Sequence, residues 1–469
     1  MVASTGEEHA TSARITALSS ETTAVVDRKM PGWSPKMGQT SNHARSGIRR
    51  RNTMNARYLG FLRCPRCGVQ APEDQASLGC PACARHGIGV NLAPAYALAP
   101  GPLPWQASQP GIFGFRGLLP LAPDDVPVSL GEGGTPLVSL RRLGTRLGLR
   151  RLMLKDEARN PTWSYKDRLA AVAVTKAAAF GASTVVVSST GNHGAAVAAY
   201  AAAAGLGCVV LTVSSVPREI RILMQAYGAC VVAYDNGPDR WAVMRAAVEA
   251  FGWMPVSGLV TPQIGSNPFG IQGYKTIAFE LWRQLGETPD VVVVPTAHGD
   301  GLAGLRRGFS DLVGLGLISR MPRLVAVDPF GAYVGGLHRE EGEQPTVATQ
   351  PSMAFSVATR RATYQGLDAI RATNGTAIAE PSNDAIARMQ LELASTEGIY
   401  AEGASVLAVL AAQQLAERRW IDPDESVVVL STSTGLKDPG SSASHLPDLP
   451  VLEPTLTALE GALPKGMCR

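Results

Sequence analysis

Short apolar runs alternate with amphipathic or alanine-rich segments along residues 128–440. The runs consist mainly of Val, Leu and Ala, and they occupy residues 184–187, 208–213, 230–234, 291–294, 324–327 and 427–430. A continuous apolar run of this length predicts a strand buried on both faces, as in a parallel sheet. The alternation of such strands with helices predicts an α/β fold built on doubly wound parallel sheet.

Helices are predicted where alanine-rich or amphipathic segments separate these strands. Residues 168–180 and 194–204 are rich in Ala, and a third helix begins at Pro217 and ends near Gly228. The segment Gly194–Val213 carries no charge over 20 residues, which is long enough for a membrane span. Glycines interrupt it, and its second half is β-branched, so we predict a helix followed by a strand in a buried core and no membrane association.

Composition divides the chain into five regions. Residues 1–57 lack apolar periodicity and are predicted to be a disordered basic leader. Residues 58–90 form a small cysteine-containing module, and residues 91–127, rich in Pro and Leu, form a linker. Residues 128–440 form the α/β domain, and residues 441–469 are predicted to be an irregular Pro-rich tail. Whether residues 1–53 belong to the natural protein stays open, because Met54 is a plausible alternative start.

The location of the net charge decides what it implies. The chain carries +4 overall, but residues 1–57 hold nine Lys and Arg against four Asp and Glu, so the remainder sums to −1. A nearly neutral body argues against a nucleic-acid partner. Hydrophobic residues make up 45% of the chain and charged residues 17%, which is typical of a globular enzyme and excludes a largely disordered protein.

Two Cys-x-x-Cys pairs lie 12 residues apart in the N-terminal module. They are Cys64 with Cys67 and Cys80 with Cys83, each with Pro after the first cysteine. Two such turns supply four thiolates for one tetrahedral metal, which predicts a structural zinc site in a zinc-ribbon-like module. The alternatives are a redox pair or a chance spacing. A zinc ribbon can bind nucleic acid or brace an enzyme, and the neutral body favours bracing.

The other cysteines indicate the compartment. Cys208 and Cys230 lie in apolar strand patterns and are predicted to be buried thiols, and Cys468 lies in the tail. An odd number of cysteines without paired contexts is typical of a reducing environment, so we expect a cytoplasmic protein.

Lys166 is a candidate nucleophile. It follows a turn-rich segment and directly precedes the Ala-rich helix. A lysine that attacks a carbonyl needs a fixed position and a lowered pKa, and a helix N-terminus beside Tyr165 is suited to provide both. Considered by itself, this segment is equally consistent with an ordinary exposed lysine.

Three polar loops follow predicted strands. They span residues 188–194, 295–301 and 431–438, and they combine hydroxyl groups with small residues. Amide groups at a helix N-terminus bind carboxylate or phosphate. Each loop alone is consistent with an ordinary connection, but several loops at the carboxyl ends of parallel strands describe one crevice.

Several motifs, in order along the chain, identify a family. They are Asn160–Arg168, Ser189–Gly194, Gly273–Glu280 and Thr432–Pro439, together with the cysteine pairs and Gly133–Leu137. The chain resembles the fold-type II pyridoxal-phosphate enzymes of the tryptophan synthase beta superfamily, and most closely the threonine synthases. The resemblance covers about residues 58–440 and implies a two-lobed catalytic domain.

The resemblance implies a role for each motif residue. Lys166 would form the Schiff base with pyridoxal 5'-phosphate and move protons, Asn192 would bind the ring hydroxyl and Thr432 the pyridine nitrogen. The cofactor phosphate would be held by Ala297, His298, Gly299, Asp300 and Gly301. The substrate carboxylate would be bound near Ser189, Thr190 and His193. A hydroxyl at the ring nitrogen favours elimination and replacement over transamination.

Some positions depart from the threonine synthase pattern. Trp163 replaces the small Gly before Ser164, Tyr165 replaces Phe, and Ala297 and His298 replace Gly and Asn. Gly270 and Gln272 stand where Arg and Glu are usual. The missing Arg is expected to contact the substrate phosphate, and a bidentate cation is hard to replace. The candidates for its replacement are Arg159, Arg168 and Arg218.

The expected activity is conversion of O-phosphohomoserine and water to threonine and phosphate. The alternative keeps the cofactor but performs β-elimination or β-replacement on serine, threonine or O-phosphoserine. A remote alternative is a non-catalytic zinc-ribbon binding protein. The resemblance also implies a small amino-acid substrate and a homodimer.

Overall fold

The computed structural model describes residues 55–340 and 342–464. The chain separates into two units, Met1–Asn52 and Thr53–Arg469, and all described residues belong to the second. The predicted leader, residues 1–57, therefore lies outside the described residues except at its last three positions. Two of these positions, Ala56 and Arg57, already belong to the first strand of the fold.

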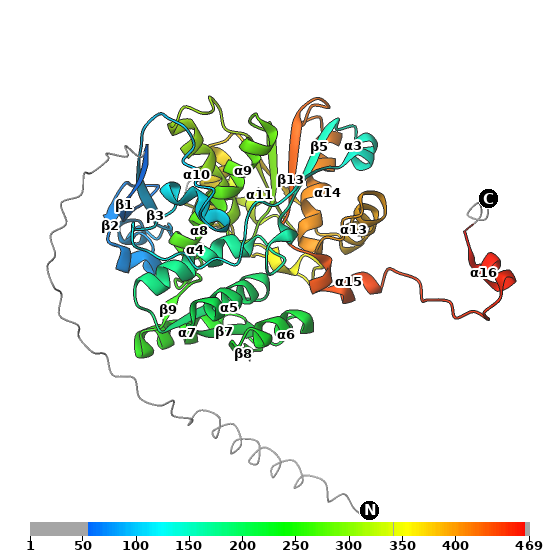
Figure 1. Cartoon of the computed structure of the whole chain (residues 1–469), viewed down its shortest axis with the longest axis horizontal. Helices are drawn as coiled ribbons and strands as arrows, with labels where there is room; N and C mark the ends of the chain where they lie inside the picture. The colour runs from blue at the N-terminus through cyan, green and yellow to red at the C-terminus, as the bar shows by residue number, and fades with distance from the viewer. Residues whose placement is uncertain (1–54, 341, 465–469) are drawn as a thin grey trace, which may run out of the picture. The chain divides into compact units, whose positions relative to one another are not determined.

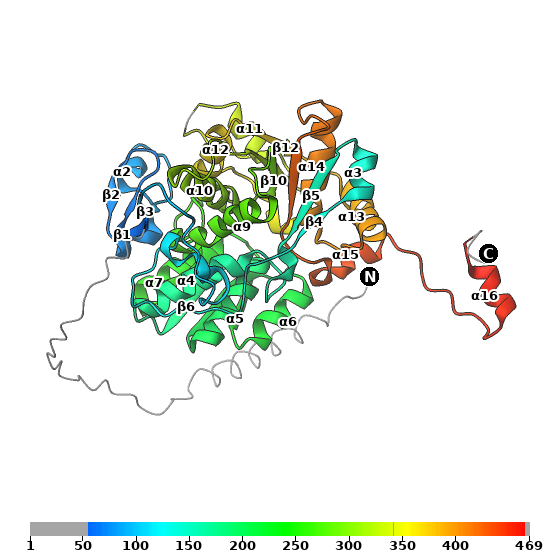
Figure 2. The same cartoon turned by 45° about the horizontal axis from the view of Figure 1, so that its top comes forward.

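An antiparallel three-stranded sheet forms the N-terminal module (Figures 1 and 2). Its order is β2-β1-β3, with β1 at Ala56–Arg63, β2 at Gln70–Ala71 and β3 at Ala93–Leu98. The short helix α2 (Pro81–Ala84) begins directly after Cys80. Because β3 pairs with β1 but begins after residue 90, we propose that this module extends to Leu98.

Part of the segment that we predicted as a linker is buried. The 3-10 helical segment η3 (Gly111–Leu118) places Ile112, Phe113 and Phe115 in the hydrophobic core. The ring of Phe115 lies 5.1 Å from the ring of Phe279, centroid to centroid. Residues of the 91–127 region therefore contribute to the core of the fold as well as connecting two regions.

A six-stranded sheet forms the larger lobe. Its strand order is β12-β11-β10-β13-β5-β4, and all neighbours are parallel except β4 and β5. The strands are β4 (Leu137–Ser139), β5 (Arg151–Asp156), β10 (Val291–Pro295), β11 (Arg323–Asp328), β12 (Thr376–Ala379) and β13 (Ser426–Ser431).

The continuous apolar runs of this sheet serve two cores. In β10, Val291 and Val293 pack in the core that contains α14 (Gly403–Glu417). Val292 and Val294 face the opposite core, which contains α10 (Asp300–Gly314). Successive side chains of a strand point to opposite faces, so a strand covered by helices on both sides needs apolar residues at every position. The other helices of this lobe are α3 (Arg141–Leu147), α9 (Lys275–Leu285), α11 (Ala332–Leu337), α12 (Tyr364–Arg371) and α13 (Asn383–Glu397).

A four-stranded parallel sheet of order β8-β7-β6-β9 forms the smaller lobe (Figure 1). Its strands are β6 (Thr184–Ser188), β7 (Gly207–Val213), β8 (Cys230–Tyr234) and β9 (Met254–Pro255). The helices in and beside this lobe are α4 (Lys166–Ala179), α5 (Asn192–Ala204), α6 (Arg218–Ala226), α7 (Asp239–Phe251) and α8 (Pro268–Ile271). The six predicted strands and three predicted helices are confirmed, with ends that shift by a few residues.

The uncharged run Gly194–Val213 divides as predicted. It forms most of α5 and all of β7, and the left-handed Gly205 (φ 68°) ends the helix. Within residues 55–340 and 342–464, no helix has the length and hydropathy that a membrane span requires.

One cysteine prediction is wrong. Cys230 is exposed, whereas Cys208 on the neighbouring strand is buried as expected. The difference arises because β8 is an edge strand of the smaller sheet. An apolar run shows that a segment is a strand but not whether the strand lies at the edge of its sheet.

The C-terminal region contains helices that we did not predict. Helix α15 (Pro439–Ala443) follows the last strand motif, and α16 (Leu456–Ala462) lies inside the tail that we predicted to be irregular. The Thr455 side chain accepts a hydrogen bond from Ala458 N at 3.2 Å and caps α16. None of the residues of α16 is buried, so this helix depends on local capping.

Candidate active site

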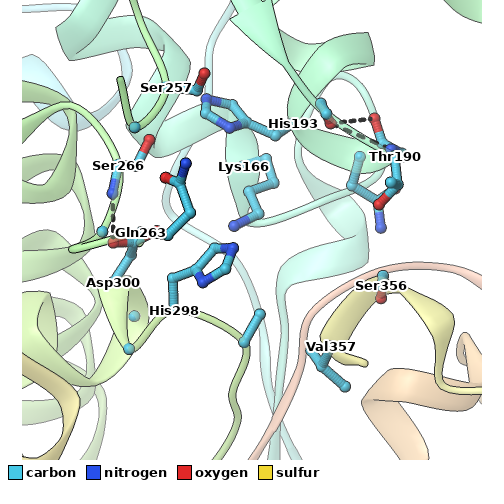
Figure 3. A pocket seen from close by; sticks show the side chains of 18 of the residues that line it. Lys166, Thr190, His193, Ser257, Gln263, Ser266, His298, Asp300, Ser356 and Val357 are labelled. Carbon is cyan, nitrogen blue, oxygen red and sulfur yellow. Dashed lines mark hydrogen bonds between the residues drawn. The ribbon is translucent and has the colours of Figure 1, made fainter. Parts of the chain in front are cut away.

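A pocket lies where loops from both lobes converge (Figure 3). It is lined by residues 188–193 after β6, by residues 295–301 after β10 and by Thr432 after β13. Lys166 at the start of α4 completes one wall. The crevice that we predicted at the carboxyl ends of parallel strands is therefore present.

Lys166 extends into this pocket beside two stacked aromatic rings. Its Nζ lies 4.7 Å from the ring centroid of Tyr165 and 5.8 Å from that of Tyr274. The two rings stack with centroids 4.8 Å apart and an interplanar angle of 22°. Among the described residues, none forms an ion pair or hydrogen bond with this Nζ. The aromatic support fixes the position of the amine and leaves it free to react.

The turn before Lys166 is held by buried hydrogen bonds. Asp167 accepts hydrogen bonds from Thr162 N at 3.0 Å and Thr162 Oγ1 at 2.8 Å. Burial raises the pKa of Asp167 to about 7, against the lowering effect of these hydrogen bonds. Tyr165 N donates to the carbonyl of Thr432 at 3.0 Å, which brings the last strand loop next to the lysine.

Trp163 occupies a backbone conformation that favours glycine. Its φ is 58°, and its side chain is 46% exposed and does not line the pocket. The glycine usual at this position is explained by the left-handed backbone. Trp163 therefore does not narrow the pocket, and its exposure keeps it out of the hydrophobic core.

The loop after β6 contains residues in two different situations. The hydroxyl of Ser189 accepts hydrogen bonds from Gly191 N at 3.1 Å and Gly194 N at 2.9 Å, so it organises the start of α5. Thr190 and His193 line the pocket, and the Nε2 of His193 is buried without a hydrogen-bond partner. Burial, with a further contribution from Lys166, lowers the pKa of His193 to about 3, so this ring is neutral near pH 7.

Asn192 belongs to a buried charged cluster beside the pocket. Its Nδ2 donates to Glu402 at 2.8 Å, and its Oδ1 accepts from Lys437 Nζ at 2.8 Å and from Ser433 Oγ at 3.3 Å. Desolvation lowers the pKa of Lys437 to about 8 and raises the pKa of Glu402. An amide nitrogen carries two hydrogens, so one hydrogen of Nδ2 is left for a ligand.

The loop after β10 directs its carbonyl groups away from the pocket. The carbonyl of Ala297 accepts from Tyr333 Oη at 3.0 Å, and that of His298 accepts from Thr363 Oγ1 at 2.8 Å and Gln365 Nε2 at 3.0 Å.

The start of α10 offers free amide groups to an anion. Ala303 is the first residue of the helix whose N–H bonds back, to the carbonyl of Gly299, and the described residues provide no acceptor for the N–H groups of Asp300 and Gly301. Gly299 has φ 71°, and a Cβ there would lie 2.6 Å from the Cα of Gly366. Free N–H groups at a helix N-terminus form a phosphate site.

Asp300 is the one carboxylate of this loop, and it is already engaged. Its Oδ1 accepts hydrogen bonds from Ser266 N at 2.9 Å and from Gln365 Nε2 at 2.7 Å. It therefore fastens the loop after β10 to the segment before α8.

Thr432 lies in the pocket as predicted. Its hydroxyl and that of Ser405 are 3.0 Å apart, and Ser405 Oγ accepts from the N–H groups of Thr432 and Ser433. Ser405, which the sequence reasoning missed, fixes the orientation of Thr432.

The structure also tests the three candidate replacements for the missing arginine. Arg168 is completely buried and bonded to Glu157 and Glu280. Arg159 pairs with Asp156, and Arg218 lines an adjoining hollow that shares Thr190 with the pocket. The described structure places none of the three in the pocket, which instead contains Arg240 at the start of α7. Arg240 was not identified from the sequence, because it lies in α7, outside every motif of the family.

Gly270, the position of the missing arginine, faces helix α4. A Cβ there would lie 2.9 Å from the carbonyl oxygen of Leu169, and a Cβ at Gly273 would lie 1.9 Å from that of Arg168. Both glycines let this segment pack closely against α4. This backbone does not accommodate an arginine at position 270.

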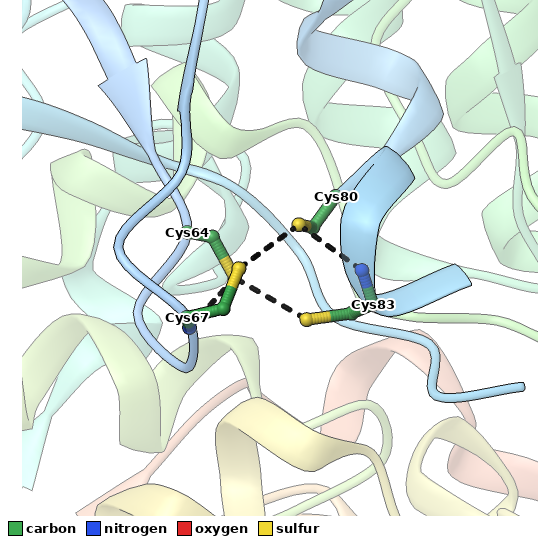
Figure 4. Close-up of side chains that lie close together, drawn as sticks. All are labelled: Cys64, Cys67, Cys80 and Cys83. Atoms are coloured by element: carbon green, nitrogen blue, oxygen red, sulfur yellow. Dashed lines mark hydrogen bonds between the residues drawn. The ribbon is translucent and has the colours of Figure 1, made fainter. Parts of the chain in front are cut away.

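The four cysteines of the N-terminal module converge (Figure 4). All four sulfur atoms lie within 4.8 Å of one another, with Cys64 to Cys83 at 3.7 Å and Cys67 to Cys80 at 3.6 Å. A zinc ion bonded to four thiolates at ~2.3 Å places the sulfurs about 3.8 Å apart. The cluster therefore has the dimensions of a four-thiolate metal site.

This cysteine module packs behind the pocket. Asn91 Nδ2 donates to the carbonyl of Ser266 at 2.8 Å. A Cβ at Gly79 or at Gly89 would lie within 2.7 Å of the side chain of Ile264. The module thus supports the segment that carries Ser266, whose N–H in turn donates to Asp300 in the loop after β10.

Comparisons with known proteins agree with this geometry. Residues 128–433 match the family model described as pyridoxal-phosphate dependent enzyme. A threonine synthase of Mycobacterium tuberculosis is 33% identical over 353 residues, which is 74% of this chain and 92% of that protein. A threonine synthase of Methanosarcina acetivorans is 30% identical over 416 residues, which is 86% of this chain and 98% of that protein.

A solved structure supports the fold. The processed form of threonine deaminase isoform 2 from Solanum lycopersicum has a TM-score of 0.57 at 20% identity, covering 74% of this chain and 94% of that one. The family model spans well over half of the chain, and the relatives named above are 30% identical or more. The chain therefore belongs to the pyridoxal-phosphate dependent enzyme family, as a lyase similar to the threonine synthases.

Proposed function

We propose that this enzyme converts O-phosphohomoserine and water to threonine and phosphate. The observation that carries the proposal is a pocket in which an unpaired lysine lies between two helix N-termini, in a chain 33% identical to threonine synthases. Two helix N-termini suit a cofactor and a substrate that are both anionic.

The residues of the pocket fit pyridoxal phosphate. Bound pyridoxal phosphate supplies an aldehyde that bonds to amino groups and a ring that draws electrons from the substrate Cα. The free N–H groups at the start of α10 match its phosphate, and Lys166 Nζ matches its aldehyde. We assign the phosphate to Ala297–Gly301, the ring hydroxyl to the second hydrogen of Asn192 Nδ2, and the ring nitrogen to Thr432 Oγ1.

Lys166 is proposed to carry the proton at the substrate Cα. Its amine has no partner among the described residues, so it can bond to the cofactor and, once the substrate amino group has displaced it there, accept the proton as a free amine. The stacked rings of Tyr165 and Tyr274 hold the amine in one place. Such positioning matters because proton transfer requires contact at hydrogen-bond distance.

The loop after β6 is proposed to bind the substrate carboxylate. Thr190 and His193 face the pocket, so the Thr190 hydroxyl can donate a hydrogen bond to the carboxylate, while the neutral His193 adds no charge. Ser189 contributes by shaping the loop, since its hydroxyl already accepts two backbone hydrogen bonds.

A second candidate function is β-elimination or β-replacement on serine, threonine or O-phosphoserine. Gly270 favours it, because the arginine expected to bind the phosphate of O-phosphohomoserine is absent there. The cofactor assignment is the same for both reactions, so only the substrate separates them.

A substrate panel decides between the two. Purified enzyme with pyridoxal phosphate is mixed with O-phosphohomoserine, O-phosphoserine, serine or threonine. We expect phosphate and threonine in equal amounts from the first compound. Absence of phosphate release from O-phosphohomoserine, together with keto-acid formation from serine or threonine, contradicts the proposal and establishes the alternative.

We propose that the four cysteines hold a structural zinc ion. Four protein ligands leave no open position for a substrate. Metal analysis of the purified protein should find one zinc per chain, and Cys64→Ser with Cys80→Ser should lose it. The remote alternative, a non-catalytic zinc-ribbon protein, predicts no absorbance from lysine-bound cofactor and salt-sensitive binding to nucleic acid.

A homodimer and a cytoplasmic location complete the proposal. The first rests on the family resemblance, and the second on the odd number of cysteines outside the metal cluster. Light scattering of the purified protein, which would report about twice the chain mass of 49.2 kDa, tests the dimer.

A further inference from the structure

We propose that Arg240, together with Gln263, binds a second anionic group on the side chain of the amino-acid substrate. This inference rests on the proposed function and names the residues that select a phosphorylated substrate. The basic group comes from α7 of the smaller lobe, whereas the family pattern would place it at Gly270.

Arg240 is a partly buried cation without a counter-ion among the described residues. Its Nε and Nη1 atoms are shielded from solvent and have no hydrogen-bond acceptor within the described part of the chain. No carboxylate of residues 55–340 and 342–464 forms an ion pair with it, and its guanidinium lies 4.5 Å over the ring of Trp241. Desolvation alone lowers the pKa of Arg240 to about 10.

The same pocket contains other donors without acceptors. The Nε2 of Gln263 and the hydroxyl of Ser188 are both buried and unpartnered. Figure 3 shows the side chains of Gln263, His193 and His298 around Lys166. Buried polar atoms in native proteins are nearly always bonded, so a group of unmatched donors indicates a ligand rich in acceptors.

The charged side chains that line the pocket, Lys166 and Arg240 against Asp300, sum to +1. Lys166 and Arg240 line it, and its one lining carboxylate, that of Asp300, already accepts two hydrogen bonds. The cofactor phosphate is assigned to the start of α10, and the substrate carboxylate to the start of α5. These assignments leave Arg240 and Gln263 for a third anionic group.

A phosphate monoester fits these two residues by its chemistry. Guanidinium groups bind phosphate oxygens through paired hydrogen bonds, and an amide nitrogen adds another donor. A substrate with a neutral side chain would leave both donors buried and unmatched, which costs affinity. The arrangement therefore selects a phosphorylated amino acid over serine or threonine.

Steady-state kinetics of the cofactor-loaded enzyme test this inference. We expect Arg240→Met to lower kcat/KM for O-phosphohomoserine by about 10- to 100-fold, mainly through KM, because charge-assisted hydrogen bonds contribute at this level. Arg240→Lys keeps the charge, so its kcat/KM should lie between those of Arg240→Met and the wild type. Arg221→Met removes an exposed arginine of neighbouring α6 and should match the wild type.

Two further readouts identify the bound anion. Cofactor affinity, followed by absorbance, should be the same in Arg240→Met as in the wild type, since the cofactor phosphate is held elsewhere. Inorganic phosphate should inhibit the wild type competitively and inhibit Arg240→Met at least 10-fold more weakly. A variant with unchanged KM overturns the inference, as does one that loses cofactor while retaining KM.

Failure of the proposed function is distinguishable from failure of this inference. If the wild type releases no phosphate from O-phosphohomoserine, the proposed reaction is wrong. Calorimetric binding of inorganic phosphate to the cofactor-loaded wild type and to Arg240→Met then decides the role of Arg240. Equal binding by the two proteins contradicts the inference, and loss of binding in the variant supports it.

Discussion

Two arginines of this enzyme lie in opposite environments. Arg168 in α4 donates to Glu157 at 2.7 Å and to Glu280 at 2.6 Å, and Glu280 also accepts from Lys155 at 2.8 Å. Arg240 in α7 lines the pocket, and its Nε and Nη1 find no acceptor in the described residues. The hydrogen-bond donors of Arg168 are matched by carboxylates in a closed network, whereas two donor atoms of Arg240 have no acceptor.

The difference between these environments indicates a structural role for Arg168 and a ligand-binding role for Arg240. A buried cation with matched carboxylates contributes to the fold, and its removal leaves uncompensated charge in the interior. A partly buried cation whose shielded nitrogens have no acceptor costs the fold free energy unless a ligand supplies the acceptors. Mutations in the network of Arg168, Glu157 and Glu280 should therefore lower stability, and mutations in the pocket should lower activity.

The largest expected effect is on the lysine of the open pocket. Lys166→Ala should lower the rate by at least about 10⁴-fold, because it removes both the covalent partner of the cofactor and the proton carrier. The thermal unfolding midpoint of the cofactor-free protein should stay within a few degrees of the wild type. A variant that keeps measurable turnover and lysine-type absorbance contradicts the assignment of Lys166.

The closed network should show the reverse response. Arg168→Met should lower the free energy of unfolding by about 3–5 kcal/mol, because Glu157 would remain buried without its cation and Glu280 would keep only Lys155. Urea denaturation of the cofactor-free protein measures this change. Arg159→Met, at an arginine side chain that is 70% exposed, is the matched control and should change stability by less than about 1 kcal/mol.

A pH effect of intermediate size belongs to the pocket. His193 titrates at about pH 3 in the folded protein and near 6.5 when unfolded, so the unfolded chain binds the extra proton between these values. Stability from this group is complete above pH 6.5 and falls as pH decreases, by about 2 kcal/mol at pH 5. Urea denaturation measures the free energy of unfolding at pH 7 and at pH 5. Between these pH values the wild type should lose about 2 kcal/mol more than His193→Asn. Equal losses in the two proteins would show that His193 is not buried in its neutral form.

The smallest expected effect is on stability and comes from Trp163, in the turn before Lys166. Trp163→Gly should raise stability by at most about 1 kcal/mol, because glycine accepts a φ of 58° without strain but loses more entropy on folding. Activity should change little, since the Trp163 side chain does not line the pocket. A decrease in stability would show that the indole makes contacts that its exposure does not suggest.

The sequence predicted the strands and loops of the fold well. Continuous valine runs such as Val291–Val294 indicate buried parallel strands, and motif order placed Lys166 and Thr432 in one crevice. Edge position was not predictable, because Cys230 has the same apolar neighbours as a central strand residue. Local patterns report burial of a segment, not its place in the sheet.

The substrate side of the pocket could not be predicted from the sequence. Arg240 and Gln263 lie in segments without motifs, and only tertiary packing brings them to Lys166. The pairing of Arg168 with both glutamates was not predictable for the same reason, since Glu157 and Glu280 are more than a hundred residues apart in the chain. Pairing of charges across long distances in the chain is decided by the fold.

A crystal structure of the cofactor-loaded enzyme with inorganic phosphate tests the central comparison most directly. The account predicts an anion within hydrogen-bond distance of Arg240 Nη1 and Gln263 Nε2, separate from the cofactor phosphate at the start of α10, and no anion near Arg168. An Arg240 side chain paired with a protein carboxylate, or a phosphate bound elsewhere in the pocket, would contradict it.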